Sequence, residues 1–161
     1  MTVQRSWKRW AWIGFAIVAV VFVFFSYQTA QSPAKSAQEQ AVAIAKKKAG
    51  LKTKTGFYWY NRDQTYFTVA GTNQKNTPVY VLIHKKNGAI NVYKQSAGIS
   101  RNDALTKVWN HQNPKKVLNI NFGLYKNRPV WQVAYVKKNG SLNYDTIDFK
   151  TGETTQLIQN L

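Results

Sequence analysis

Side chains able to transfer protons or bind a metal are scarce in this sequence. The best placed are two histidines, His84 and His111, and one close pair of acids, Asp145 and Asp148. These acids stand three positions apart in an expected strand, so alternation puts them on opposite faces, unlike a catalytic pair. Motifs of zinc peptidases, serine hydrolases and phosphate-binding loops are absent, as is cysteine. We predict a protein that is not an enzyme and has no catalytic, metal-binding or cofactor-binding residues.

Aromatic residues carry a stronger signal than the acids and histidines. The run FYWY at residues 57–60 sends its two tyrosines, Tyr58 and Tyr60, to one face of an expected strand. Trp131 and Tyr135 share a face of a later strand in the same way. Packing in the core is one interpretation of such rings, and an exposed surface for a protein or a glycan is the other. These four residues are candidate partner-binding residues.

A strand followed by two lysines and Asn-Gly occurs twice. It reads PVYVLIHKKNG at residues 78–88 and PVWQVAYVKKNG at residues 129–140. Asn-Gly favours a two-residue type I′ hairpin turn, which needs positive φ at both positions. The lysines are either solvated charges at strand ends or contacts for an anionic partner. The candidate contacts are Lys85, Lys86, Lys137 and Lys138.

The N-terminal part of the sequence predicts a membrane anchor. Residues 10–27 carry no charge, and as a helix they would rise about 27 Å, close to the thickness of a hydrocarbon core. All three basic residues of the preceding tail, residues 1–9, stand directly before this segment, which places the tail in the cytoplasm and the rest outside the cell. A cleaved signal peptide is the alternative interpretation.

Net charge narrows the class of partner. The chain has 161 residues, with 23 Lys and Arg against 6 Asp and Glu. Three of the basic residues precede residue 28 and no acid does, so the exported part keeps 20 basic residues and a formal charge of +14. Because this part lies outside the cell, we exclude nucleic acid as a partner. Anionic lipid head groups, anionic wall polymers and acidic protein surfaces remain.

The rest of the chain reads as a polar tether, residues 28–35, followed by two similar modules. The modules cover residues 36–95 and 96–161. Each begins with a helix-start pattern, serine followed three positions later by an acid, and continues as short strands with turn signals. We therefore expect an α+β fold in which each module packs one helix on an antiparallel sheet of three or four strands.

The quoted strands resemble a known family. FYWYNRDQTYFTVAG, PVYVLIHKKNG and PVWQVAYVKKNGSLNYDTIDFKTGE are similar to segments of the YpmB/TseB-like cell wall elongation regulators of Gram-positive bacteria. The last segment also resembles the small PepSY-type domain. The resemblance implies two cystatin-like modules outside the membrane, the second PepSY-like. It also implies a role in cell wall elongation through a penicillin-binding transpeptidase as partner.

Three hypotheses on function follow. The first is a non-catalytic, membrane-anchored adaptor that binds and regulates a penicillin-binding transpeptidase. The second is a binder of anionic wall polymers through the lysine-tipped hairpins, with affinity that falls as salt rises. The third is an inhibitor of an extracellular peptidase, which rests only on analogy of fold.

Overall fold

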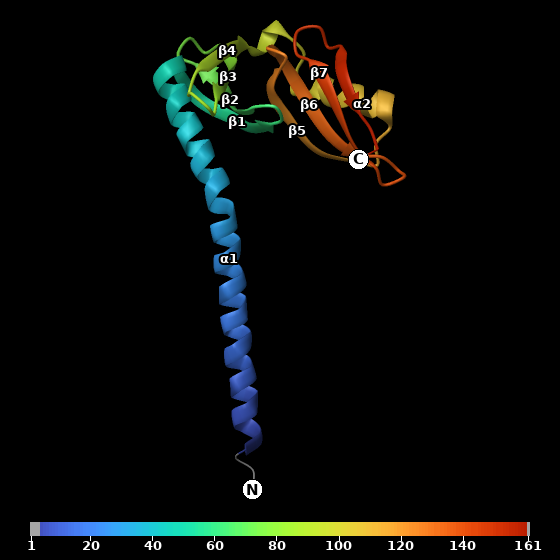
Figure 1. Ribbon diagram of the computed structural model, residues 1–161. Coiled ribbons are helices and arrows are strands. Elements are labelled where there is room, and N and C mark those ends of the chain that lie inside the picture. The colour runs from blue at the N-terminus through green and yellow to red at the C-terminus, as the bar shows by residue number, and fades with distance from the viewer. Residues whose placement is uncertain (1–3, 161) are drawn as a thin grey trace. The chain divides into compact units, whose positions relative to one another are not determined.

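The computed structural model describes residues 4–160 of the chain, and the side chains of residues 12, 13, 15–20 and 34–160 (Figure 1). Two compact units are distinguished, Met1–Ala37 and Gln38–Leu161. Helix α1 runs from Gln4 to Ala49. All other elements lie in the second unit, which carries the sites described below.

Helix α1 begins well before the position that the sequence predicts. The pattern of serine and acid at residues 36–39 lies inside the helix, and so do residues 28–35, expected as a tether. Residues 15–32 contain neither glycine nor proline, and the helix continues through Pro33 into the residues that follow. A capping pattern starts a helix only where the preceding chain is not already helical.

The predicted membrane anchor, residues 10–27, also falls within α1. Most of its side chains lie outside the described residues. In the part of the chain that the structure describes, no helix combines the length and apolar character needed to cross a bilayer. The anchor therefore stays a prediction.

The second unit has an α+β fold with two four-stranded antiparallel sheets, each with its strands in chain order. The strands of the first sheet are β1 (Leu51–Asn61), β2 (Thr65–Asn73), β3 (Pro78–His84) and β4 (Ile90–Lys94). Those of the second sheet are β5 (Lys116–Tyr125), β6 (Arg128–Val136), β7 (Leu142–Asp148) and β8 (Thr154–Ile158). A single 3-10 turn, η1 (Gln95–Ala97), and helix α2 (Arg101–Gln112) connect the two sheets.

Each face of the first sheet is covered by a different neighbour. On one face, Ala41 and Ala45 from the end of α1 pack against a cluster of buried aliphatic residues. That cluster consists of Leu51, Val69, Val79, Val81 and Ile83. On the other face, Tyr80 and Leu82 pack with residues of the second sheet and of α2, including Phe122 and Trp131. The two sheets therefore share one core, which we call the joint core.

The edge strand β5 lies across the first sheet beside β1 (Figure 1). Gly123 of β5 lets the ring of Tyr60 approach, because a Cβ atom at this position would lie 2.2 Å from the ring. The neighbouring Phe122 points into the joint core and stacks on Tyr80, with ring centroids 4.6 Å apart. A strand edge that would otherwise leave backbone groups unpaired is thus covered by the first sheet.

Helix α2 begins as the sequence predicts. Ser100 Oγ accepts a hydrogen bond from the N–H of Asp103 (3.1 Å), and the Asp103 carboxylate accepts one from the N–H of Ser100 (2.8 Å). This reciprocal pair is a capping box. Ala104 and Val108 then face the joint core, which fixes α2 against the second sheet.

The Asn-Gly turns are not the predicted type I′ turns. Gly88 and Gly140 have positive φ (66° and 88°), but Asn87 and Asn139 do not. Each asparagine instead accepts a hydrogen bond from the N–H two residues on, at 3.1 Å, as in an Asx turn. The two-residue turn with positive φ at both positions is residues 126–127, which joins β5 to β6.

Candidate functional site

Three of the four aromatic candidates lie in the joint core instead of on a partner-binding surface. Tyr60, Trp131 and Tyr135 are at most 1% exposed. Trp131 Nε1 donates to Ile99 O (3.1 Å), and the Tyr135 hydroxyl donates to Asp145 Oδ1 (3.2 Å). Only Tyr58 is partly exposed. Alternation along the strand correctly separates its side chains into two faces. It does not reveal that the second sheet covers the face that carries Tyr60.

The two lysine-tipped hairpins differ in shape. In the first, the N–H of His84 donates to Ala89 O (2.9 Å), so four residues form the loop and both Lys85 and Lys86 are exposed in it. In the second, the N–H of Lys137 donates to Ser141 O (3.0 Å), so only three residues form the loop. The extra residue before the second turn places Lys137 at the end of the strand pair instead of in the loop.

The hairpins also lie at different ends of the sheets. The N–H of Lys85 donates to Thr65 O (3.1 Å), which ties the first tip to the β1–β2 turn. The β1–β2 turn also contacts the β5–β6 turn, because the Arg62 guanidinium lies 4.2 Å from the centre of the Tyr125 ring. Lys137 follows β6 at its opposite end, and a strand of nine residues spans about 27 Å. The structure therefore does not gather the four candidate lysines into one site.

Instead, the contacts between these turns bring a different group of cations together. Lys48 Nζ also donates a hydrogen bond to Gly88 O (3.1 Å), which joins the end of α1 to the tip of the β3–β4 hairpin. Asp63, in the β1–β2 turn, is the one acidic residue among these contacting turns. We call this group the basic edge, and it consists of Lys48, Arg62, Lys85, Lys86, Lys126 and Arg128.

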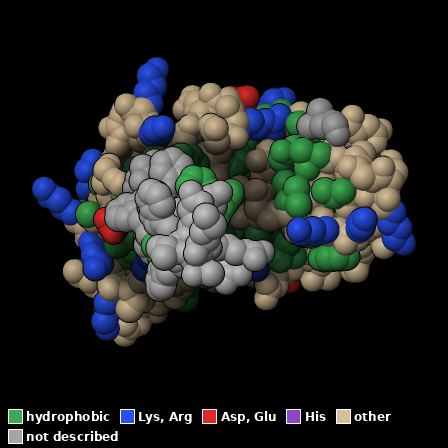
Figure 2. All heavy atoms as spheres, turned by 90° about the horizontal axis from the view of Figure 1, so that it is seen from below, with side chains coloured by type: hydrophobic (Ala, Val, Ile, Leu, Met, Phe, Trp, Pro, Cys, Tyr) green, Lys and Arg blue, Asp and Glu red, His purple; other side chains and the backbone are tan. Residues whose placement is uncertain are grey.

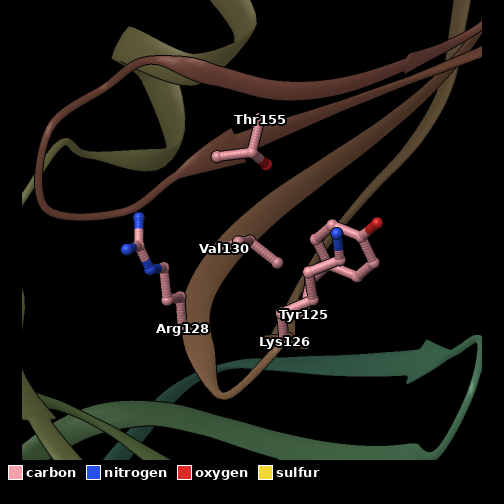
Figure 3. Close-up of a pocket in the computed structure, with 5 residues that line it drawn as sticks. All are labelled: Tyr125, Lys126, Arg128, Val130 and Thr155. Carbon is pink, nitrogen blue, oxygen red and sulfur yellow. The ribbon is translucent and has the colours of Figure 1, made fainter.

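A pocket of about 320 Å³ opens at the basic edge (Figure 3). Lys126 and Arg128 lie on opposite sides of Val130, and Thr155 of β8 completes the wall together with Tyr125. Such a pocket offers an apolar floor and two cations at its rim. It suits a carboxylate or phosphate group attached to an apolar stem, as in an acidic side chain of a partner protein.

Most acidic side chains of the second unit already accept hydrogen bonds from other groups of the protein. Asp103 caps α2, and Asp145 accepts from Tyr135. Asp148 lies on the opposite face of β7, as the sequence predicts, and accepts from the N–H groups of residues 150 and 151 (2.8 and 3.0 Å). On the face drawn in Figure 2, Lys and Arg side chains are far more prominent than Asp and Glu. The surface thus presents mainly positive charge to a partner.

Sequence reasoning missed Arg62, Tyr125, Lys126 and Arg128. No motif distinguishes them, because each is an ordinary turn residue in its own segment. They meet only because β5 lies across the first sheet, a tertiary relationship that strand periodicity does not encode. The one local signal was the cluster of polar and basic residues at 125–128, which is typical of a turn.

Comparisons with known proteins agree on the family. The family model described as the cell wall elongation regulator TseB-like domain matches residues 40–84. A Bacillus subtilis (strain 168) protein named "Probable cell wall elongation regulator TseB" is 28% identical over 147 residues, which cover 90% of this chain and 91% of that protein. The solved structure of the YpmB protein from Bacillus subtilis aligns with a TM-score of 0.65 and 28% identity. That alignment covers 75% of this chain and 95% of the other.

The matched segment runs from the end of α1 to the end of β3, and therefore includes Lys48 and Arg62 of the basic edge. The similarity to the Bacillus subtilis protein and to the YpmB structure extends over most of the second unit as well. Residues 40–84 therefore match the cell wall elongation regulator TseB-like domain, and most of this chain is similar to the Bacillus subtilis proteins named TseB and YpmB.

Proposed function

We propose that this chain regulates cell wall elongation as a non-catalytic adaptor that binds a penicillin-binding transpeptidase. Similarity to a probable cell wall elongation regulator and a match to the TseB-like domain support a regulatory role. The transpeptidase is the part of the proposal that needs direct proof.

The basic edge carries the proposal for the binding surface. Six cations stand there on four contacting segments of the chain, and two of them, Lys126 and Arg128, line a pocket with an apolar floor. Charges at the rim of an interface raise the rate of association and select partners of opposite sign, whereas a pocket holds an anchoring side chain. We therefore assign the basic edge to an acidic surface of the transpeptidase, with one carboxylate side chain in the pocket between Lys126 and Arg128.

The location of the chain is part of the same proposal. Residues 10–27 would anchor it in the membrane, with the basic tail in the cytoplasm and residues 38–161 outside the cell. An anchored adaptor meets a membrane-bound enzyme by diffusion in two dimensions, which raises its effective concentration near that enzyme.

Anionic wall polymer or lipid head groups are the rival partners for the same cations. A polyanion would bind wherever lysines cluster, including Lys137 and Lys138, and its binding would weaken steeply as salt rises. A protein partner with a side chain in the pocket would depend on Lys126 and Arg128 specifically, because their positions around Val130 define the shape of the pocket.

Cross-linking in intact cells tests the proposal. Cells carrying the full chain with an affinity tag are treated with a short cross-linker, and captured material is identified by mass spectrometry. We expect a penicillin-binding transpeptidase in the covalent complex. Recovery of wall polymer or lipid without any transpeptidase would contradict the proposal and support the rival partners.

A further inference from the structure

A second pocket, of about 230 Å³, lies between β1 and the beginning of α2. Its walls include Tyr58, Tyr80 and the first two residues of α2, Arg101 and Asn102. Gly56 contributes only backbone, so no side chain from this position fills the space. The pocket is separate from the basic edge, because none of its residues lines the pocket beside Val130.

The start of α2 directs hydrogen-bond donors into this region. The first N–H groups of a helix have no acceptor within it, and the helix dipole adds partial positive charge there. In α2 the capping box satisfies only the N–H of Asp103, while the N–H of Ala104 donates to Ser100 O. The N–H groups of Arg101 and Asn102, both exposed residues, are open to solvent or a ligand.

Tyr80 provides an independent indication of a ligand. Its side chain is 4% exposed, no hydrogen bond of its hydroxyl is found within the described part of the chain, and the hydroxyl oxygen keeps access to the pocket. The ring is fixed by stacking on Phe122 and by an edge contact with Trp131, at centroid distances of 4.6 and 5.4 Å. A ring held in this way presents its hydroxyl at the pocket in a fixed position, as a donor for a ligand or water.

The hydroxyl of Tyr80 is suited to donate. Burial raises the pKa of Tyr80 to about 12; the neighbouring Tyr58 raises this pKa further and Arg101 lowers it. Burial likewise raises the pKa of Tyr58, and Arg101 lowers it. Both phenols are therefore protonated at neutral pH, and both lie within the electrostatic influence of Arg101.

From this geometry we propose that the pocket at the start of α2 binds the carboxylate of a small ligand or of a peptide chain end. The planar guanidinium of Arg101 and two adjacent backbone N–H groups match the two oxygens of a carboxylate. The hydroxyls of Tyr58 and Tyr80 add two donors, and their rings give an apolar wall for one small substituent. Asp103 does not fill the site, because its carboxylate is already held by the N–H of Ser100.

Nuclear magnetic resonance on the full isotope-labelled chain tests this site. N-acetylalanine, acetate and inorganic phosphate are titrated separately at pH 7 and constant ionic strength. We expect N-acetylalanine to produce saturable shifts of the Arg101 and Asn102 amide signals, with weaker binding of acetate. Tyr80→Phe, which keeps the ring, is expected to weaken binding about tenfold, as is Arg101→Gln on the surface.

Matched controls are Tyr144→Phe, on the face of β7 away from the joint core, and Lys116→Gln, an exposed cation at the start of β5 that lines neither pocket. Both should leave the affinity for N-acetylalanine unchanged. Absence of saturable shifts would overturn the proposal, as would equal binding by the wild type and by both pocket variants. Binding of phosphate without binding of either carboxylate would overturn the assignment of ligand class. The site does not depend on the transpeptidase, so these outcomes leave the proposed function separately testable.

Discussion

The hydroxyl of Thr68 donates a 2.9 Å hydrogen bond to the backbone carbonyl of Phe122, and both residues are fully buried. Thr68 belongs to the middle of the first sheet and Phe122 to the edge strand of the second. The bond gives the Phe122 carbonyl a partner in the first sheet. It therefore links the two sheets, and we expect them to unfold as one cooperative unit.

Thr68→Val should destabilise the chain by about 1 to 3 kcal/mol, because it leaves the Phe122 carbonyl buried without a partner while keeping the shape of the side chain. Denaturant unfolding followed by fluorescence and by circular dichroism provides the measurement. We expect a single transition that is the same for both probes. Thr155→Val is the control, because Thr155 is exposed and water can replace its bond to Thr146 O. Equal stability of wild type and Thr68→Val would contradict the role of this bond.

Gly123→Ala should destabilise the chain by at least about 1 to 3 kcal/mol, because the added methyl group would overlap the buried ring of Tyr60. Gly56→Ala is the matched control in β1. Its added methyl group would have its nearest neighbour at 3.5 Å, an ordinary contact. Thermal unfolding of the two variants gives the comparison. Similar melting temperatures for the two variants would show that β5 does not lie against Tyr60.

Asp145→Asn should stabilise the chain increasingly as pH rises from about 3 to 7. Burial raises the pKa of Asp145, while the hydrogen bond from Tyr135 and the charges of Lys137, His111 and Lys107 lower it. For an acid whose folded pKa lies above the unfolded value of 3.8, stability is highest when the acid is protonated and falls as pH rises through the folded pKa. The amide keeps an acceptor for Tyr135 without the buried charge.

Asp103→Asn is expected to show the opposite sign. Hydrogen bonds from the side chain and backbone of Ser100 lower the pKa of Asp103, so its contribution is present above the unfolded pKa and lost as pH falls. The difference in melting temperature from wild type, measured across the same pH range, separates the two cases. If the difference in melting temperature changed in the same direction with pH for both variants, Asp145 would not be the destabilising buried charge.

Deletion of residues 10–27 should release the protein from the membrane fraction if this segment is the anchor. In cells with the wall removed, a protease added outside should degrade the second unit of the full chain and spare a tag at the N-terminus. Protection of the second unit would contradict the proposed orientation. A full chain that remains soluble after cell breakage would contradict the anchor.

Local features of this protein could be predicted from its sequence. The capping box of Ser100 and Asp103 depends only on residues three positions apart, and the repeated strands were recognised from alternation and turn residues. The opposite orientation of Asp145 and Asp148 also follows from alternation, since β7 pairs with β6 without interruption. Each of these depends on contacts between neighbours in the chain.

Features set by tertiary contacts could not be predicted. Tyr60 and Trp131 look like candidates for an exposed surface until the second sheet is placed over the first. Arg62 meets Tyr125 only because β5 lies across β1. The sequence also mispredicts the start of α1, because the local capping pattern at Ser36 is overridden by the helix that precedes it.

The most direct test of the basic edge compares two double variants with the same change of charge. Lys85→Glu/Lys86→Glu alters the basic edge, and Lys137→Glu/Lys138→Glu alters the other hairpin tip. Affinity of the purified full chain for the transpeptidase captured in cells is measured at physiological salt. The account predicts that the first variant weakens binding at least about tenfold and that the second leaves it nearly unchanged. Equal loss in both variants, or loss only in the second, would contradict it.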